Sequence, residues 1–118
     1  MKDVTALLIE DPQNDFYPGG TLAVPEADQI IPVLNQYTRL FSEKKLPILV
    51  SRDWHPEDSI DFKALGGLWP PHCVQNTEGA AFYPDLKIPG EAIILSKGME
   101  GFEDRRVWRV QCGQDTAF

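Results

Sequence analysis

One carboxylate and two imidazoles in this sequence have the types and spacing needed to bind a divalent metal ion. Asp53 and His55 are two residues apart, so on an extended segment both side chains point to the same side. His72 is the other histidine of the 118-residue chain, and like His55 it lies in a polar stretch near Trp and Pro. This set suits Zn²⁺, Fe²⁺ or Mn²⁺. The alternative is two loop histidines in contact with solvent, but their shared context favours one bound divalent ion.

An acid and an amine form a second group whose residue types suit acid–base chemistry. Asp11 follows an apolar run at residues 4–9, and Lys97 follows another at residues 92–95. An acid and an amine held side by side can share protons, and each shifts the pKa of the other. Amide cleavage by such a pair calls for a thiol, because a neighbouring ammonium lowers the thiol pKa. The alternative is a structural ion pair.

Three short apolar runs predict the strands that position these groups. They cover residues 4–9, 46–50 and 92–95, and each ends in a polar cluster. Continuous apolar runs of this length are typical of buried strands in parallel sheets. Because the carboxyl ends of parallel strands meet at one edge of a sheet, we expect the polar side chains that follow them to converge there.

A helix is predicted between the first two strands. Apolar residues recur at helical spacing over residues 30–41, and Asp28 is the predicted N-cap. Residues 56–91 form a long loop rich in Pro, Gly and aromatic residues, in which we expect one short helical turn. The order of elements predicts an α/β fold, a parallel sheet with flanking helices.

Charge and composition narrow the classes of partner. The net charge is -7, which argues against nucleic acid and against anionic membrane surfaces. No apolar run approaches the roughly 18 residues that a membrane span needs, and the first residues lack a signal-peptide pattern. Cys73 and Cys112 have no spacing that favours a disulfide, so we expect a cytoplasmic protein. At 118 residues the chain is long enough for one domain at most.

Four short motifs follow one another within residues 4–98. They are Asp11-Pro-Gln-Asn-Asp-Phe16, Arg52-Asp-Trp-His-Pro56, Trp69-Pro-Pro-His-Cys-Val-Gln75 and Lys97-Gly98. In this order and spacing they resemble the nicotinamidase branch of the isochorismatase-like cysteine hydrolases. Members of that branch hydrolyse nicotinamide to nicotinate and ammonia through a thioester, which serves NAD salvage.

The resemblance implies a Rossmann-like fold, with a six-stranded parallel sheet that carries an Asp-Lys-Cys triad. In this triad Asp11 corresponds to the general base and Lys97 to its cationic partner. Phe16 and Trp69 correspond to the aromatic side chains that sandwich the pyridine ring of the substrate. We therefore expect a small-molecule amide such as nicotinamide as the substrate.

The same resemblance implies a metal site. Its ligands correspond to Asp53, His55 and His72, and the ion is often zinc, iron or manganese in that branch. Metal-free isochorismatases lack the second and third motifs. The segment after Asp58 departs from the family pattern, so water, Asp58 or Asp61 are the alternatives for a further ligand.

One departure concerns the nucleophile. The family cysteine lies on a later strand-to-helix turn, and no such turn follows Lys97 here. Cys112 is the only thiol after Lys97 but lacks the expected context, and Cys73 matches a position that is not the nucleophile. We therefore expect residues 1–118 to be a single partial hydrolase domain, truncated at the C-terminus, with only the N-terminal three strands. The exposed edge of its first strand would favour self-association.

Three functions remain open from the sequence. The first is a nicotinamidase-type amidohydrolase whose cysteine is missing from this chain. The second is a catalytically inactive remnant that binds a metal ion or a pyridine ring. The third is a hydrolase that uses a metal-bound water, with Asp11 as base. A dinucleotide site is disfavoured because no G-x-G-x-x-G motif follows the first strand.

Overall fold

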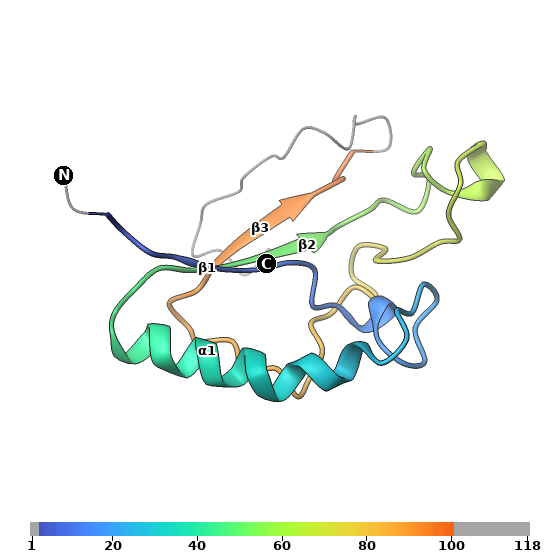
Figure 1. Ribbon diagram of the computed structural model, residues 1–118. Helices are drawn as coiled ribbons and strands as arrows, with labels where there is room; N and C mark the ends of the chain where they lie inside the picture. Colours follow the sequence, from blue (N-terminus) through green and yellow to red (C-terminus); the bar gives the residue numbers. More distant parts are fainter. Residues whose placement is uncertain (1–2, 101–118) are drawn as a thin grey trace.

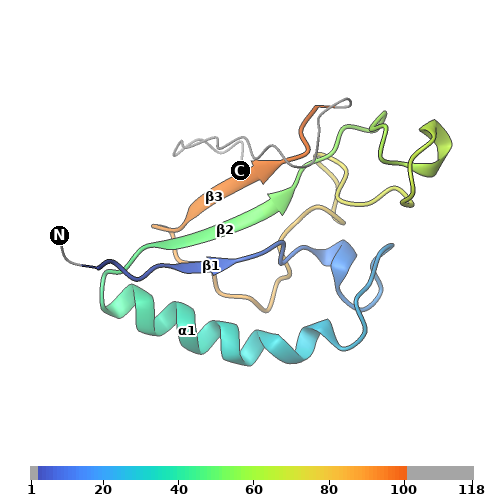
Figure 2. The same ribbon diagram turned by 45° about the horizontal axis from the view of Figure 1, so that its top comes forward.

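The computed structural model describes residues 3–100, which form a three-stranded parallel sheet with one long helix against a face (Figure 1). The strands are β1 (Leu7–Ile9), β2 (Ile48–Asp53) and β3 (Ile93–Lys97), and the helix is α1 (Ile31–Glu43). Figure 2 shows the strands side by side in the order β1-β2-β3, with β1 at one edge. This architecture confirms the predicted α/β fold class.

The strand limits differ from those predicted, for local reasons. β1 begins at Leu7, whose N–H donates to the carbonyl of Pro47; proline has no N–H with which to extend the ladder backwards. β2 and β3 run further than predicted, so Asp53 and Lys97 are the last residues of their strands and lie opposite each other. The two functional side chains are therefore held on strands rather than on the loops that follow.

The helix forms where predicted, but its start is different. A 3₁₀ turn, η2 (Ala27–Ile30), precedes α1, and the carbonyl of Asp28 accepts the N–H of Ile31. The predicted N-cap at Asp28 is therefore wrong, because Ile30 occupies the cap position and no side chain caps the helix. Pro32 lies in the first turn, where its missing N–H costs nothing. No helix among residues 3–100 is long and apolar enough to cross a membrane.

The main core lies between the sheet and α1. Alternate residues of β1 and β2 point toward the helix, and each large apolar side chain buried there contributes about 1.5–3 kcal/mol. Its buried members are Ile9, Tyr17, Ile31, Ile48, Val50 and Leu86. The opposite face of the sheet is more open, since Leu8 and Ile93 are 48% and 41% exposed.

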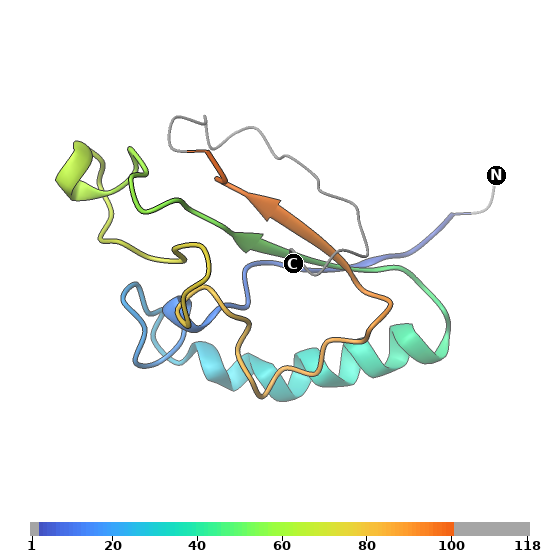
Figure 3. The same cartoon turned by 180° about the vertical axis from the view of Figure 1, so that it is seen from behind.

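The long loop between β2 and β3 contains the expected helical turn, η3 (Lys63–Leu65). Its last part runs alongside α1 (Figure 3). Asn35 of α1 attaches it there: Nδ2 donates to the carbonyl of Asp85 at 2.9 Å, and Oδ1 accepts the N–H of Lys87 at 2.8 Å. The helix therefore supports the loop as well as the sheet.

A third 3₁₀ turn, η1 (Asn14–Phe16), was not predicted. It is held against the long loop by backbone bonds from Asn14 to Ala81 and from Asp15 to Gly79. These bonds bring the segment after Asp11 next to the segment that carries His72.

Core packing against α1 leads to a first prediction. Val50 is fully buried and Val33, on α1, is 50% exposed. Val50→Ala should lower the free energy of unfolding by about 2 kcal/mol, because it removes buried methyl groups and leaves a cavity. Val33→Ala, the matched control, should change it by less than about 0.5 kcal/mol. Urea denaturation followed by circular dichroism measures both, and equal losses would contradict this assignment of the core.

Candidate active site

Three charged side chains converge at the carboxyl ends of the strands. Lys97 Nζ lies 2.7 Å from Asp11 Oδ2 and 2.5 Å from Asp53 Oδ1. All three side chains are partly buried, with 16–25% of their surface exposed. One ammonium thus holds two carboxylates that are distant in sequence, which leaves this group with a net negative charge.

The two partners of the shorter contact hold each other in the charged form. Burial favours neutral Lys97, but the charges of Asp53 and Asp11 outweigh it and raise the pKa of Lys97. Burial likewise favours neutral Asp53, but the neighbouring His55 and Lys97 outweigh it and hold the pKa of Asp53 well below its usual range. Near neutral pH the site therefore contains an ammonium and an ionised Asp53.

Asp11 is held in place by Ser51, a residue that the sequence analysis missed. The chain turns sharply at Asp11, whose φ is 49°, and its N–H donates to the carbonyl of Ser51 at 3.1 Å. The Ser51 hydroxyl donates to Asp11 Oδ1 at 2.8 Å. Lys97 contacts the other oxygen, so both oxygens of the Asp11 carboxylate have fixed partners. The only signal for Ser51 was that it is the first polar residue after the second apolar run.

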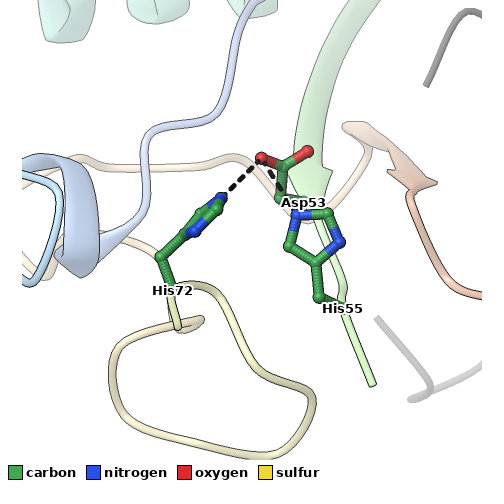
Figure 4. Close-up of side chains that lie close together, drawn as sticks. All are labelled: Asp53, His55 and His72. Atoms are coloured by element: carbon green, nitrogen blue, oxygen red, sulfur yellow. Dashed lines mark ion pairs between the residues drawn. The ribbon is translucent and has the colours of Figure 1, made fainter. Parts of the chain in front are cut away.

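The second oxygen of Asp53 faces two buried imidazoles (Figure 4). Asp53 Oδ2 lies 3.6 Å from His55 Nε2 and 3.8 Å from His72 Nε2. One ligand atom from each residue lies within 4.8 Å of the other two. Within the described part of the chain neither Asp58 nor Asp61 joins this group.

Backbone carbonyls fix the orientation of both imidazoles. His55 Nδ1 lies 3.0 Å from the carbonyl of Gly98, and His72 Nδ1 lies 2.8 Å from that of Pro70. A carbonyl can only accept, so each Nδ1 carries a proton, and Nε2 is the ring nitrogen that faces Asp53.

This donor set fits a divalent cation. Buried polar atoms are normally hydrogen-bonded, yet His55 Nε2 is buried without a hydrogen-bond partner among residues 3–100. The Nε2 atoms of both rings lie near one carboxylate oxygen of Asp53, and a cation between them would contact all three residues. The outward Nδ1 bonds are the support that metal-binding histidines usually have.

Aromatic rings surround the two histidines. Phe62, another residue that the sequence analysis missed, lies edge-on to both rings, with centroids at 5.7 Å from His55 and 5.6 Å from His72. The centroid of Phe16 lies 5.8 Å from that of His72. Trp69 is 38% exposed and its segment pairs with that of Phe62.

A groove opens beside Asp11 on the β1 side. Its volume is about 420 Å³, within the usual range for small-molecule sites. Phe16, Tyr17 and Val24 are among its lining residues. An organic substrate in this groove would lie next to the Asp11 carboxylate.

Cys73 is the cysteine that the structure describes, and its surroundings keep it unreactive. It is fully buried, and burial raises the pKa of its thiol, an effect that the charge of Asp53 strengthens. Its N–H donates to Asp15 Oδ2 at 2.7 Å, which holds the backbone beside His72. A thiol that stays protonated is a poor nucleophile. Cys112, the other cysteine, lies outside the described residues.

Gly98 allows a direct test of the histidine geometry. Its φ is 65°, and a Cβ at this position would lie 2.5 Å from Cε1 of His55. Gly98→Ala should therefore displace that ring and weaken Zn²⁺ binding about 10- to 100-fold. Gly66→Ala is the matched control, because Gly66 also has a positive φ, 93°, with nothing within 4 Å of its added Cβ. Competition with a chromophoric chelator measures both affinities, and equal values would contradict this role of Gly98.

Comparison with known proteins places the chain in a family. Residues 5–114 match the family model of the isochorismatase domain. The nicotinamidase of Acinetobacter baylyi is 41% identical over 109 residues, which cover 79% of this chain and 49% of the relative.

Two solved structures have the same arrangement. Pyrazinamidase of Pyrococcus horikoshii, in complex with zinc, gives a TM-score of 0.80 at 52% identity, over 84% of this chain and 54% of that one. PnC1 from L. infantum, in complex with nicotinate, gives 0.71 at 33% identity, over 83% and 49%. The chain spans about half the length of these relatives. With the matching domain, the parallel sheet and these relatives, the chain belongs to the isochorismatase family.

Proposed function

We propose that this chain carries the acid–base and metal-binding groups of a nicotinamidase-type amidohydrolase, which converts nicotinamide and water to nicotinate and ammonia. The observation that carries the proposal is the double contact of Lys97, which links Asp11 to a metal-binding carboxylate, Asp53. Similarity to proteins named nicotinamidase supports an amide substrate. A role in NAD salvage follows from that reaction.

In this proposal Asp11 is the general base. Its carboxylate is held by Ser51 and Lys97, so it accepts a proton from a fixed position. It takes the proton of an attacking thiol and delivers it to the departing ammonia, while a thioester forms at the carbonyl carbon. Water then hydrolyses the thioester to the carboxylate and restores the thiol. The buried Cys73 is unsuited to this step, so the thiol comes from outside residues 3–100.

We assign Asp53, His55 and His72 as ligands of one divalent ion. The two imidazole nitrogens favour zinc, iron or manganese over magnesium or calcium, which prefer oxygen ligands. When bound, the ion supplies a positive charge that can polarise an oxygen or nitrogen of the substrate. We assign Phe16 and Trp69 to contacts with the flat ring of the substrate, and the groove beside Asp11 and Phe16 supports the first assignment.

The function is tested on the natively purified protein loaded with Zn²⁺. It should release ammonia from nicotinamide, and Asp11→Asn should lower kcat about 10²- to 10⁴-fold by removing the base. Asp28→Asn, an exposed aspartate on η2, is the matched control and should leave kcat unchanged. The intact mass of the same sample shows whether its polypeptide extends beyond Phe118.

Other outcomes favour the competing functions. Nicotinamide binding measured by calorimetry, without ammonia release, would replace the proposal with a binding function. Turnover that survives thiol alkylation but stops on chelation would replace the thioester route with hydrolysis by a metal-bound water.

We also propose self-association through β1. Its described ladder is with β2 on one side only, and an unpaired apolar edge can accept a strand from another chain. Leu8, in this strand, is 48% exposed, and Val4, which precedes the strand, is 74% exposed. A cytoplasmic location, and the lack of nucleic-acid and membrane partners, stay predictions based on charge and composition.

A lysine in this strand tests the association. Leu8→Lys should shift sedimentation toward the monomer, because a charged side chain opposes pairing and apolar contact at the edge. Leu68→Lys is the matched control: Leu68 is 79% exposed in the long loop, and its replacement should leave the association unchanged. Analytical ultracentrifugation over a concentration series measures both. A wild-type protein that stays monomeric throughout would overturn the proposal.

A further inference from the structure

Gln13 is completely buried, and its side-chain amide makes three hydrogen bonds. Nε2 donates to the carbonyl of Asp53 at 2.7 Å and to that of Ala80 at 3.0 Å. Oε1 accepts the N–H of Asp53 at 2.8 Å. The side chain therefore satisfies both backbone groups of one residue, as a neighbouring strand would.

The backbone beside β2 cannot supply these bonds itself. β1 pairs with β2 only up to Ile9 and Val50, and the chain then turns away at Asp11, where φ is 49°. Continued in register, the partners of Asp53 would be the carbonyl of Asp11 and the N–H of Gln13, but these two groups bond to each other at 2.8 Å. The Gln13 side chain thus replaces a strand partner at Asp53, whose backbone N–H and carbonyl β1 does not reach.

This replacement clamps Asp53 between two partners. On one side lies the amide of Gln13, and on the other β3, where Lys97 is the register partner of Asp53. The N–H of Trp54, the next residue, donates to the carbonyl of Lys97 at 2.9 Å. With the backbone held on both sides, the Cα–Cβ bond of Asp53 keeps a fixed direction, from which one carboxylate oxygen reaches Lys97 and the other faces the imidazoles.

We propose that Gln13 is a positioning residue, which orients Asp53 so that one oxygen meets Lys97 and the other meets the metal ion. This inference rests on the proposed metal-binding function of Asp53. The bond to Ala80 extends the clamp to the long loop that carries His72, so a single amide connects the η1 segment, β2 and that loop.

The chemistry of the position allows few replacements. Glutamate has the same shape as Gln13 but offers no donor, so it would set a carboxylate against the carbonyls of Asp53 and Ala80. Methionine has a similar length and makes none of the three bonds. Glutamate loses the two bonds that Nε2 donates, whereas methionine loses all three and does so without burying a charge.

The experiment compares Gln13→Glu and Gln13→Met with the wild type in the natively purified protein. Zn²⁺ affinity, from chelator competition, should fall about 10- to 100-fold in each variant that folds. The kcat for nicotinamide should fall with little change in KM. Gln29→Glu, at an exposed position on η2, is the matched control for the added charge and should change neither quantity.

The melting temperature and the Zn²⁺ affinity together distinguish a positioning role of Gln13 from a merely structural one. The melting temperature of the metal-free protein reports stability alone; a lower value with unchanged Zn²⁺ affinity and kcat would mean that Gln13 is merely structural and would overturn the proposal. If the wild-type protein releases no ammonia, Zn²⁺ affinity still reports on Gln13. In that case a fall in affinity supports the positioning role while the amidohydrolase function fails.

Discussion

The two oxygens of the Asp53 carboxylate serve two different groups, and the rest of the site depends on this division. Oδ1 contacts Lys97, which in turn contacts Asp11, and Oδ2 faces the Nε2 atoms of His55 and His72. A partly buried carboxylate is stable only if its charge is compensated. Lys97 provides part of that compensation, and a cation held between Asp53, His55 and His72 would provide more of it. Asp53 therefore connects the Asp11–Lys97 ion pair to the two histidines.

The backbone around these side chains has positive φ at three positions. Asp11, Cys73 and Gly98 all have positive φ, and each lies next to or within the groups that hold the charged side chains. For non-glycine residues such conformations cost about 1–3 kcal/mol each, and they persist only where surrounding contacts hold them. Here Ser51 bonds the N–H and carboxylate of Asp11, and Asp15 bonds the N–H of Cys73. The hydrogen bonds around the site thus offset local strain.

The two faces of the sheet are covered to different extents. The α1 face carries the main core, whereas Leu8 and Ile93 on the other face remain 48% and 41% exposed. Parallel sheets usually have both faces covered, because their strands are apolar on both sides. Covering the exposed half of each side chain would contribute roughly 0.7–1.5 kcal/mol, which is appreciable beside the roughly 5–15 kcal/mol that stabilises a typical domain. The described unit therefore gains much from any polypeptide that binds at this face or at the β1 edge.

The sequence by itself determined the three strands and the helix, and it predicted which polar side chains meet at the carboxyl ends of the strands. Apolar runs and helical spacing are local patterns, and the order of strand, helix and strand limits the fold to a parallel sheet whose ends meet. The pair Asp53 and His55 was visible from its two-residue spacing. Only the tertiary structure decided which oxygen meets which partner, that Ile30 rather than Asp28 is the N-cap of α1, and that Gln13 bonds the backbone of Asp53. The contact between Gln13 and Asp53 joins residues 40 positions apart, and such contacts form only when the chain folds, so no local pattern announces them.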